Sequence, residues 1–121
     1  MPIFLAVFLG GGLGSVTRYI VSRTITSNFT DINPMGTFVA NLLSTLILGV
    51  ILSISSSRMN VSSITSALLI VGFCGGFSTF STFSYETFEL IRTGNYIFAV
   101  ANLFISLILG VGVLFILAKT L

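Results

Sequence analysis

The chain has 121 residues, of which 55% are hydrophobic and only 7% are charged. A soluble domain of this length needs more charge to cover its surface, so the composition indicates an integral membrane protein. A membrane-spanning helix needs about 20 residues, so the length allows roughly four spans with short loops. The net charge of +2 is too small to indicate a nucleic-acid partner.

The residue types needed for catalysis are nearly absent. Histidine is missing and Cys74 is the single cysteine, which removes the usual general base and excludes an intrachain disulfide. We expect Cys74 to be a small packing residue. The sequence therefore predicts that the protein is not an enzyme. The apolar N-terminus lacks a basic region and a cleavage site, so we expect it to begin the first span.

The first span is predicted from about Ile3 to Ser22. Gly10 and Gly14 form a small-residue face that lets another helix approach closely. Arg18 lies near the end of this span and has two interpretations. Its side chain either extends to the lipid headgroups, or it faces an aqueous vestibule and concentrates anions there.

A polar loop is predicted from Thr24 to Met35, followed by a second span from about Gly36 to Ser53. The turn-forming residues of the loop are Asp31, Asn33 and Pro34. The second span has one amide, Asn41, with Thr37 one turn before it. Asn41 either forms an interhelical hydrogen bond, as membrane asparagines commonly do, or lines a pore and donates to an anion.

The third span is predicted from near Ile64 to Ile91, and its middle is unusual. The stretch 72–84 contains three glycines, five hydroxyl side chains and four phenylalanines, with no charged residue. Glycine weakens helices, so the stretch predicts a break. A break at membrane depth is tolerated only where it is buried in protein or lines a wet cavity. We therefore expect the functional site here.

Two kinds of recognition are available at this break. Phe80 and Phe83 share a helix face, and the positive edges of their rings would partly replace the water around a small anion. Ordinary core packing is the alternative. Separately, the carbonyls freed at Gly75 and Ser78 offer oxygen ligands to a hard cation such as Na⁺. A two-fold axis at the break would bring four such carbonyls together.

A tight turn is predicted at 92–95, with Gly94 available for a left-handed cap. The fourth span then runs from about Tyr96 to Ala118. Its small or polar positions are Asn102, Ser106, Gly110 and Gly112.

Basic residues are nearly balanced between the two sides of the membrane. Arg58 and Lys119 fall on one side, and Arg23 and Arg92 fall on the other, with Arg18 near the boundary. A chain without a positive-inside bias inserts in both orientations. The sequence thus predicts a dual-topology homodimer of antiparallel subunits.

The chain resembles the Fluc/CrcB family of fluoride channels over nearly its whole length. The third of the three motifs that carry this resemblance is highly specific; the motifs are 10–19 (GGGLGSVTRY), 36–41 (GTFVAN) and 72–83 (GFCGGFSTFSTF). The resemblance implies an all-α membrane protein in which residues 1–121 form one four-helix channel subunit with a broken third helix. It also implies an antiparallel homodimer with two pores that releases toxic fluoride passively across the cell membrane.

The resemblance implies functional roles for the residues of this chain that match the family's motifs. The implied fluoride pathway contains Asn41, Phe80, Phe83, Ser81, Thr82, Thr37 and Glu86. Arg18 would lie near a vestibule, and the carbonyls of Gly75 and Ser78 would hold a structural Na⁺ at the dimer centre. Ser44 departs from the family pattern, which usually has glycine there, and we expect its hydroxyl to affect helix packing.

Two other functions compete with the channel. A small multidrug-type, proton-coupled exporter also has four short spans, but such transporters carry a membrane-embedded Glu in the first span, and none is present here. A non-transporting scaffold would explain the glycine faces but not the polar stretch in the third span.

Overall fold

The computed structural model describes residues 2–25, 34–57 and 63–118, and the described residues are helical except at short connections. The helices are α1 (Ile3–Ile25), α2 (Met35–Ser57), α3 (Ser63–Ser66), the π-helix η1 (Ala67–Cys74), α4 (Gly75–Phe77), α5 (Phe80–Arg92) and α6 (Tyr96–Leu117). Elements α3 to α5 follow one another along a single span, so the described residues contain four helical segments long and apolar enough to cross a membrane. The chain is therefore a multi-pass membrane protein.

The predicted spans agree with these helices to within a few residues. The first continues to Ile25 and the second to Ser57, each beyond its predicted end. Pro34 directly precedes α2, and its carbonyl accepts the Phe38 N–H at 2.8 Å. The predicted turn residues Asp31 and Asn33, and the basic residues Arg58 and Lys119, lie outside the described part of the chain.

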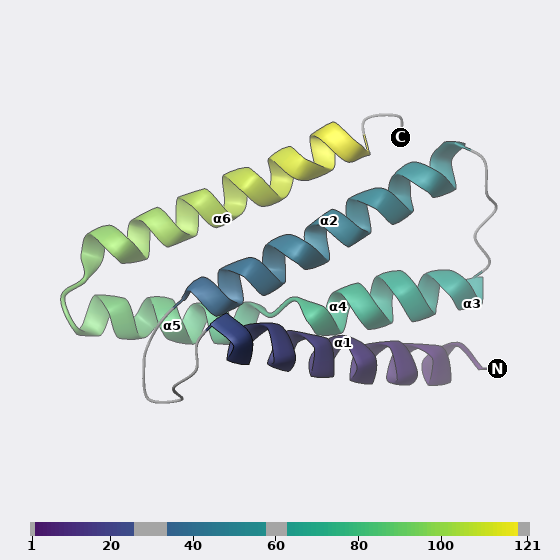
Figure 1. The fold of residues 1–121 in the computed structure, drawn as a ribbon, viewed down its shortest axis with the longest axis horizontal. Helices are drawn as coiled ribbons and strands as arrows, with labels where there is room; N and C mark the ends of the chain where they lie inside the picture. The colour runs from purple at the N-terminus through teal and green to yellow at the C-terminus, as the bar shows by residue number, and fades with distance from the viewer. Residues whose placement is uncertain (1, 26–33, 58–62, 119–121) are drawn as a thin grey trace.

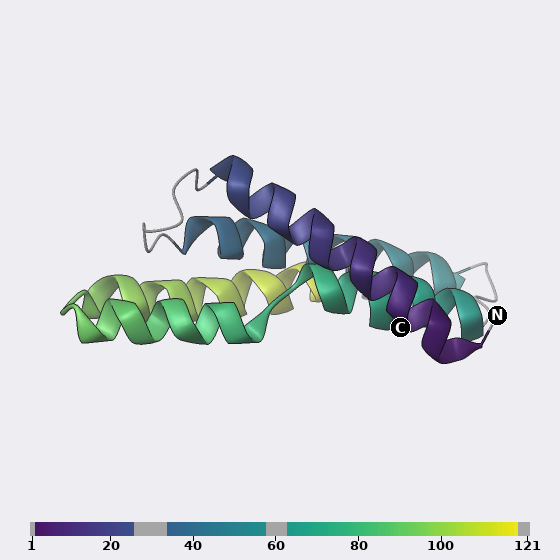
Figure 2. The ribbon, with the colours of Figure 1, turned by 90° about the horizontal axis from the view of Figure 1, so that it is seen from below.

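The spans pack as neighbouring helices with distinct partners. The first span, α1, packs on η1 and α4, whereas α2 packs on α6 and also contacts α1. Helices α5 and α6 form an antiparallel pair (Figure 1). Figure 2 shows that the third span changes direction between α4 and α5, so that α5 leaves α1 and runs beside α6.

The contact between α1 and η1 depends on glycine, as the sequence predicted. Gly10 and Gly14 are buried on α1. A Cβ on Gly10 would collide with the Leu68 carbonyl, and a Cβ on Gly14 would lie 2.8 Å from the Phe77 nitrogen. Backbone atoms cannot rotate away as a side chain can, so this close approach of helices requires glycine.

The wider turns of η1 come directly before α4. The Gly75 N–H donates to the Ile70 carbonyl, five residues earlier, as in a π-helix. Cys74 ends η1 and is buried, so it is the small packing residue that was predicted.

The turn between α5 and α6 has the predicted left-handed glycine. Gly94 has φ +85°, its N–H donates to the Ile91 carbonyl, and the Asn95 N–H donates to the Leu90 carbonyl at 2.7 Å. These two bonds form a Schellman motif, which satisfies carbonyls at the end of a helix.

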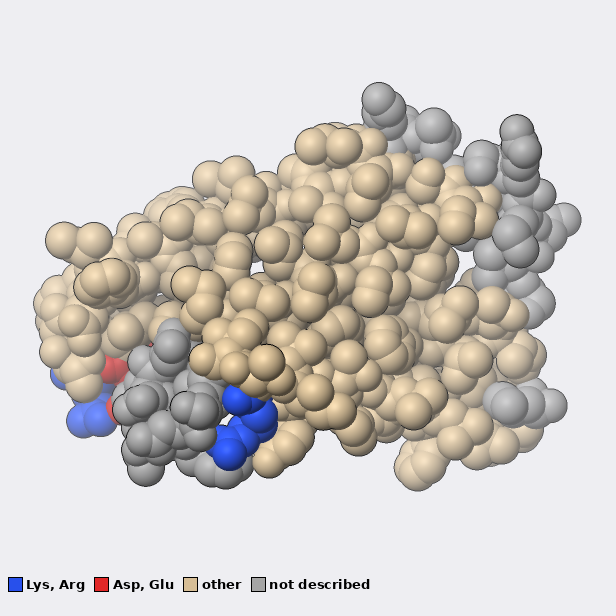
Figure 3. All heavy atoms as spheres, viewed as in Figure 1, with Lys and Arg blue, Asp and Glu red and all other residues tan. Residues whose placement is uncertain are grey.

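Side chains on the outer surface suit a lipid environment. Large apolar residues are exposed along α6, among them Ile97 at 82% and Phe115 at 73%. The charged side chains visible in Figure 3 form two groups, a basic group nearer the middle of the molecule and a group with acidic atoms at the end where α5 meets α6. Arg92 pairs there with Glu89, which is buried.

Candidate functional site

The third span is interrupted by two residues with extended backbone angles. Ser78 has φ −84° and ψ 159°, and Thr79 has φ −149° and ψ 123°. We refer to these two residues as the extended segment. Thr79 caps α5, because its hydroxyl accepts the Thr82 N–H at 3.2 Å. The interruption leaves several backbone groups without their helical partners, and side chains from α1 and α2 replace some of them.

Asn41 on α2 binds the peptide groups of Thr79. Its Oδ1 accepts the Thr79 N–H at 2.8 Å, and its Nδ2 donates to the Thr79 carbonyl at 3.4 Å. Of the two interpretations of Asn41, the interhelical hydrogen bond is therefore present. Because Oδ1 must face the Thr79 N–H, the amide orientation is fixed, and the second N–H of Nδ2 remains available to another acceptor.

Arg18 and Ser44 bind carbonyls immediately before the extended segment. The Nε of Arg18 donates to the Gly76 carbonyl at 3.2 Å, a contact that neither interpretation of Arg18 anticipated. The buried Ser44 hydroxyl donates to the Cys74 carbonyl at 2.8 Å. The expected effect of Ser44 on helix packing is thus a specific hydrogen bond between α2 and η1.

Gly75 and Ser78 lose their helical donors. In a continuous helix the Gly75 carbonyl would accept the Thr79 N–H, which instead donates to Asn41. The Ser78 carbonyl would accept the Thr82 N–H, which instead donates to the Thr79 hydroxyl. Gly75 keeps helical backbone angles (φ −64°, ψ −37°), whereas Ser78 is extended. The role of the two carbonyls as Na⁺ ligands stays a prediction, and the described residues contain no cluster of Cys, Asp and Glu side chains for a metal.

The two phenylalanines of the predicted ring-edge pair are neighbours at the start of α5. The ring centroids of Phe80 and Phe83 are 6.3 Å apart, with 37° between the planes. Phe80 is 79% exposed, so its ring projects away from the rest of the chain, whereas Phe83 is partly covered.

The remaining predicted residues of the pathway lie along α5 and the facing turn of α2. The Thr37 hydroxyl donates to Oε2 of Glu86 at 3.0 Å. Among the described residues, Oε1 of Glu86 is buried without a hydrogen-bond partner. The Ser81 hydroxyl is 3.3 Å from the Thr79 hydroxyl. The structure thus brings Thr37 to Glu86 and Asn41 to Thr79, although both pairs are far apart in sequence.

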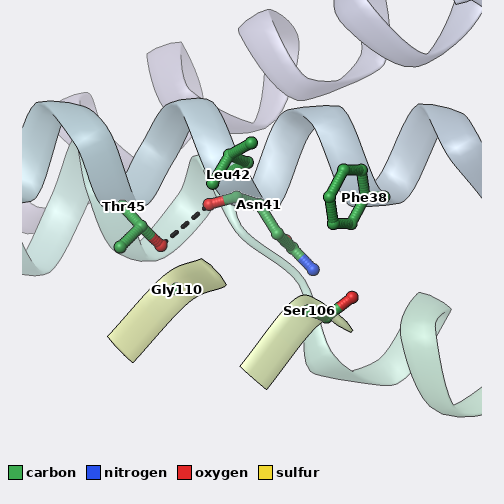
Figure 4. A pocket seen from close by; sticks show the side chains of 6 residues that line it. All are labelled: Phe38, Asn41, Leu42, Thr45, Ser106 and Gly110. Atoms are coloured by element: carbon green, nitrogen blue, oxygen red, sulfur yellow. Dashed lines mark hydrogen bonds between the residues drawn. The ribbon is translucent and has the colours of Figure 1, made fainter. Parts of the chain in front are cut away.

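A small cavity of about 30 Å³ adjoins Asn41 between α2 and α6. It is lined by Phe38, Asn41, Leu42, Thr45, Ser106 and Gly110. Figure 4 shows the Asn41 amide pointing from α2 toward Ser106 on α6. This volume suits a ligand about as large as one water molecule. Sequence reasoning noted Ser106 and Gly110 as small or polar positions but assigned them to no site; their spacing of one helical turn was the available signal.

Residues 5–118 match the family described as "CrcB-like protein, Camphor Resistance (CrcB)". Several relatives bear the name "Fluoride-specific ion channel FluC". The relative from Gloeothece citriformis is 39% identical over 113 residues, covering 93% of this chain and 90% of the relative. The relative from Azobacteroides pseudotrichonymphae is 43% identical over 108 residues, covering 89% and 86%. The relative from Escherichia coli is 39% identical over 108 residues, covering 89% and 84%. Because these matches extend over nearly all of the sequence, the chain belongs to the CrcB family.

Proposed function

We propose that the protein is a fluoride-selective channel that lets fluoride leave the cell passively across the cell membrane, and that it is not an enzyme. The cavity beside Asn41 carries this proposal. It is water-sized, its polar lining is an amide and two hydroxyls, and no charged residue lines it. The Thr45 and Ser106 hydroxyls already donate to oxygens of Asn41 and Asn102, so the donor left for an anion is the second N–H of Asn41. A neutral donor binds a small anion without trapping it, which conduction requires. The relatives named as fluoride channels support the same function.

Efflux from liposomes tests the function directly. Purified protein is reconstituted into liposomes loaded with fluoride or with chloride, and efflux is followed with ion-selective electrodes. We expect fluoride to leave rapidly and chloride to be retained. Fluoride efflux no faster than from empty liposomes would refute the channel. A dependence of the flux on a proton gradient would instead favour a coupled exporter.

The pathway in this proposal runs past Asn41, Phe80 and Phe83, with hydroxyls of the third span alongside. The exposed ring of Phe80 needs a cover inside a functional channel. We propose that a second, antiparallel copy provides it, so that rings of the two copies contribute to each of two pores. Residues exposed on the third span of one protomer support this arrangement, namely Val71, Gly75 and Phe80.

Dual topology has a separate test. We expect a C-terminal tag to be accessible from both faces of the membrane in whole cells and inverted vesicles, because the basic residues are balanced between the two sides. A tag found on one face only would refute the antiparallel homodimer. Channel function would survive that result, since the efflux assay does not depend on it.

The third span acts, in this proposal, as a broken helix that holds a structural Na⁺. The carbonyls of Gly75 and Ser78 from each of two copies would be its ligands. Their diverted helical donors support the site. Replacing Na⁺ by a large organic cation should then lower the dimer's thermal stability, and Na⁺ should restore it. Identical stability in both media would count against the cation.

A further inference from the structure

Two buried side-chain atoms lack a hydrogen-bond partner in the described residues, 2–25, 34–57 and 63–118. They are Oε1 of Glu86 and Nδ2 of Asn102. Unpaired buried polar groups cost stability and are rare in folded proteins, so each one needs an explanation. Glu86 already belongs to the proposed pathway. Asn102 lies in the middle of α6 and has no assigned role.

Hydrogen bonding within α6 determines which end of the Asn102 amide is left unpaired. The Ser106 hydroxyl, one turn later, donates to Oδ1 of Asn102 at 3.3 Å. Oδ1 is therefore occupied, and the amide keeps two N–H donors on Nδ2. Asn102 therefore offers the hydrogen-bond donors that an anion needs.

Asn102 also lies at a second cavity between α2 and α6, of about 210 Å³. The other lining residues are apolar: Pro34, Met35, Phe38, Phe98, Ala101 and Ile105. Because Met35, Phe98 and Ile105 are exposed in the single chain, this cavity is open on one side. Phe38 also lines the small cavity beside Asn41, so the two cavities are neighbours. Along α6, Asn102 adjoins the larger cavity and Ser106 the smaller one.

We propose that Asn102 donates a hydrogen bond to fluoride as the ion moves between the larger cavity and the small cavity beside Asn41. This inference rests on the proposed fluoride-channel function. An anion in the larger cavity would otherwise meet only apolar side chains, and Nδ2 of Asn102 is the polar group that stabilises it there. The hydroxyl of Ser106 keeps the amide in the orientation that presents this donor.

The variant Asn102→Leu tests the proposal, because leucine has nearly the same shape and no donor. We expect fluoride efflux to fall roughly ten- to a hundredfold, as for loss of a hydrogen bond to a charged group. The thermal unfolding temperature should stay unchanged or rise, because the variant removes an unpaired buried amide. A residue needed only for packing would not give this combination.

A second variant at Asn102 and a control variant at Asn95 complete the test. Asn102→Asp preserves the shape and the acceptor for Ser106 but removes the amide donor, so its efflux should also fall. Asn95→Leu makes the same exchange as Asn102→Leu at an exposed amide that bonds only Thr93, and should conduct normally. Efflux within twofold of wild type for Asn102→Leu, or a large drop in its unfolding temperature, would overturn the proposal. Absence of fluoride efflux from the wild type would refute the channel function itself.

Discussion

Replacing Gly14 by alanine should separate α1 from the third span. A Cβ at this position would lie 2.8 Å from the Phe77 nitrogen and 3.1 Å from the Phe73 carbonyl carbon. The Cβ would also collide with the Phe73 carbonyl oxygen. These are backbone atoms of η1 and α4, so the strain is relieved only if whole helices move apart. Overpacking of this kind costs about 1–3 kcal/mol.

Gly12 provides a matched control on the same helix. A Cβ on Gly12 would meet nothing within 4 Å, and alanine favours a helix over glycine by up to about 1 kcal/mol. Gly14→Ala gains the same helix propensity, so the free energies of unfolding of the two variants should differ by the overpacking cost alone, about 1–3 kcal/mol, with Gly12→Ala the more stable.

Gly14→Ala should also lower the conduction of fluoride. Arg18 follows Gly14 by one helical turn, and its 3.2 Å bond to the Gly76 carbonyl requires α1 to lie close to α4. Moving α1 outward breaks this bond beside the extended segment. Thermal unfolding in detergent and fluoride efflux from liposomes measure the two effects on the same preparations. If Gly14→Ala unfolds at the same temperature as Gly12→Ala, close packing of α1 on backbone atoms is not what makes glycine necessary.

Three further substitutions test other contacts. Asn41→Leu removes both bonds to the Thr79 peptide and should destabilise the fold by about 1–2 kcal/mol while abolishing efflux; a wild-type unfolding curve would contradict this. Phe80→Ile should slow fluoride strongly without lowering the unfolding temperature of the chain, because the ring lies outside its core; unchanged efflux would remove the ring-edge role. Gly94→Ala forces a side chain into φ +85° and should cost about 1–2 kcal/mol, measured by unfolding, whereas no change would mean that the turn relaxes.

The spans and the turn between α5 and α6 were predictable because they depend on local properties. Hydropathy locates a run of apolar residues whatever its neighbours are, and a glycine between Thr93 and Asn95 favours a left-handed cap in isolation. Gly10 and Gly14 were also predictable as a packing face, since spacing on one helix is enough. The end of α2 was harder to predict, because its last turn is rich in serine and is not apolar; this turn reaches Ser57.

The π-helix and the hydrogen bonds at the extended segment could not be predicted in the same way. The sequence of η1, Ala67–Cys74, would equally suit an α-helix, so its wider turns have no compositional signal. The partners of Arg18 and Asn41 are backbone groups far along the chain. Their identity depends on how α1 and α2 are rotated toward the third span, which single-helix periodicity does not determine. The sequence therefore left two interpretations open for each residue.

For Asn41, the bond to Thr79 explains why structural and pore roles need not be alternatives. A helix interrupted in a membrane exposes peptide groups that must find partners, and α2 supplies one partner at that depth. Its Oδ1 is used for the Thr79 N–H, which turns the amide nitrogen toward the small cavity. One hydrogen bond thus holds the extended segment and orients the donor that we assign to the pathway. A substitution that spares this bond but removes the donor would separate the two roles, whereas Asn41→Leu removes both.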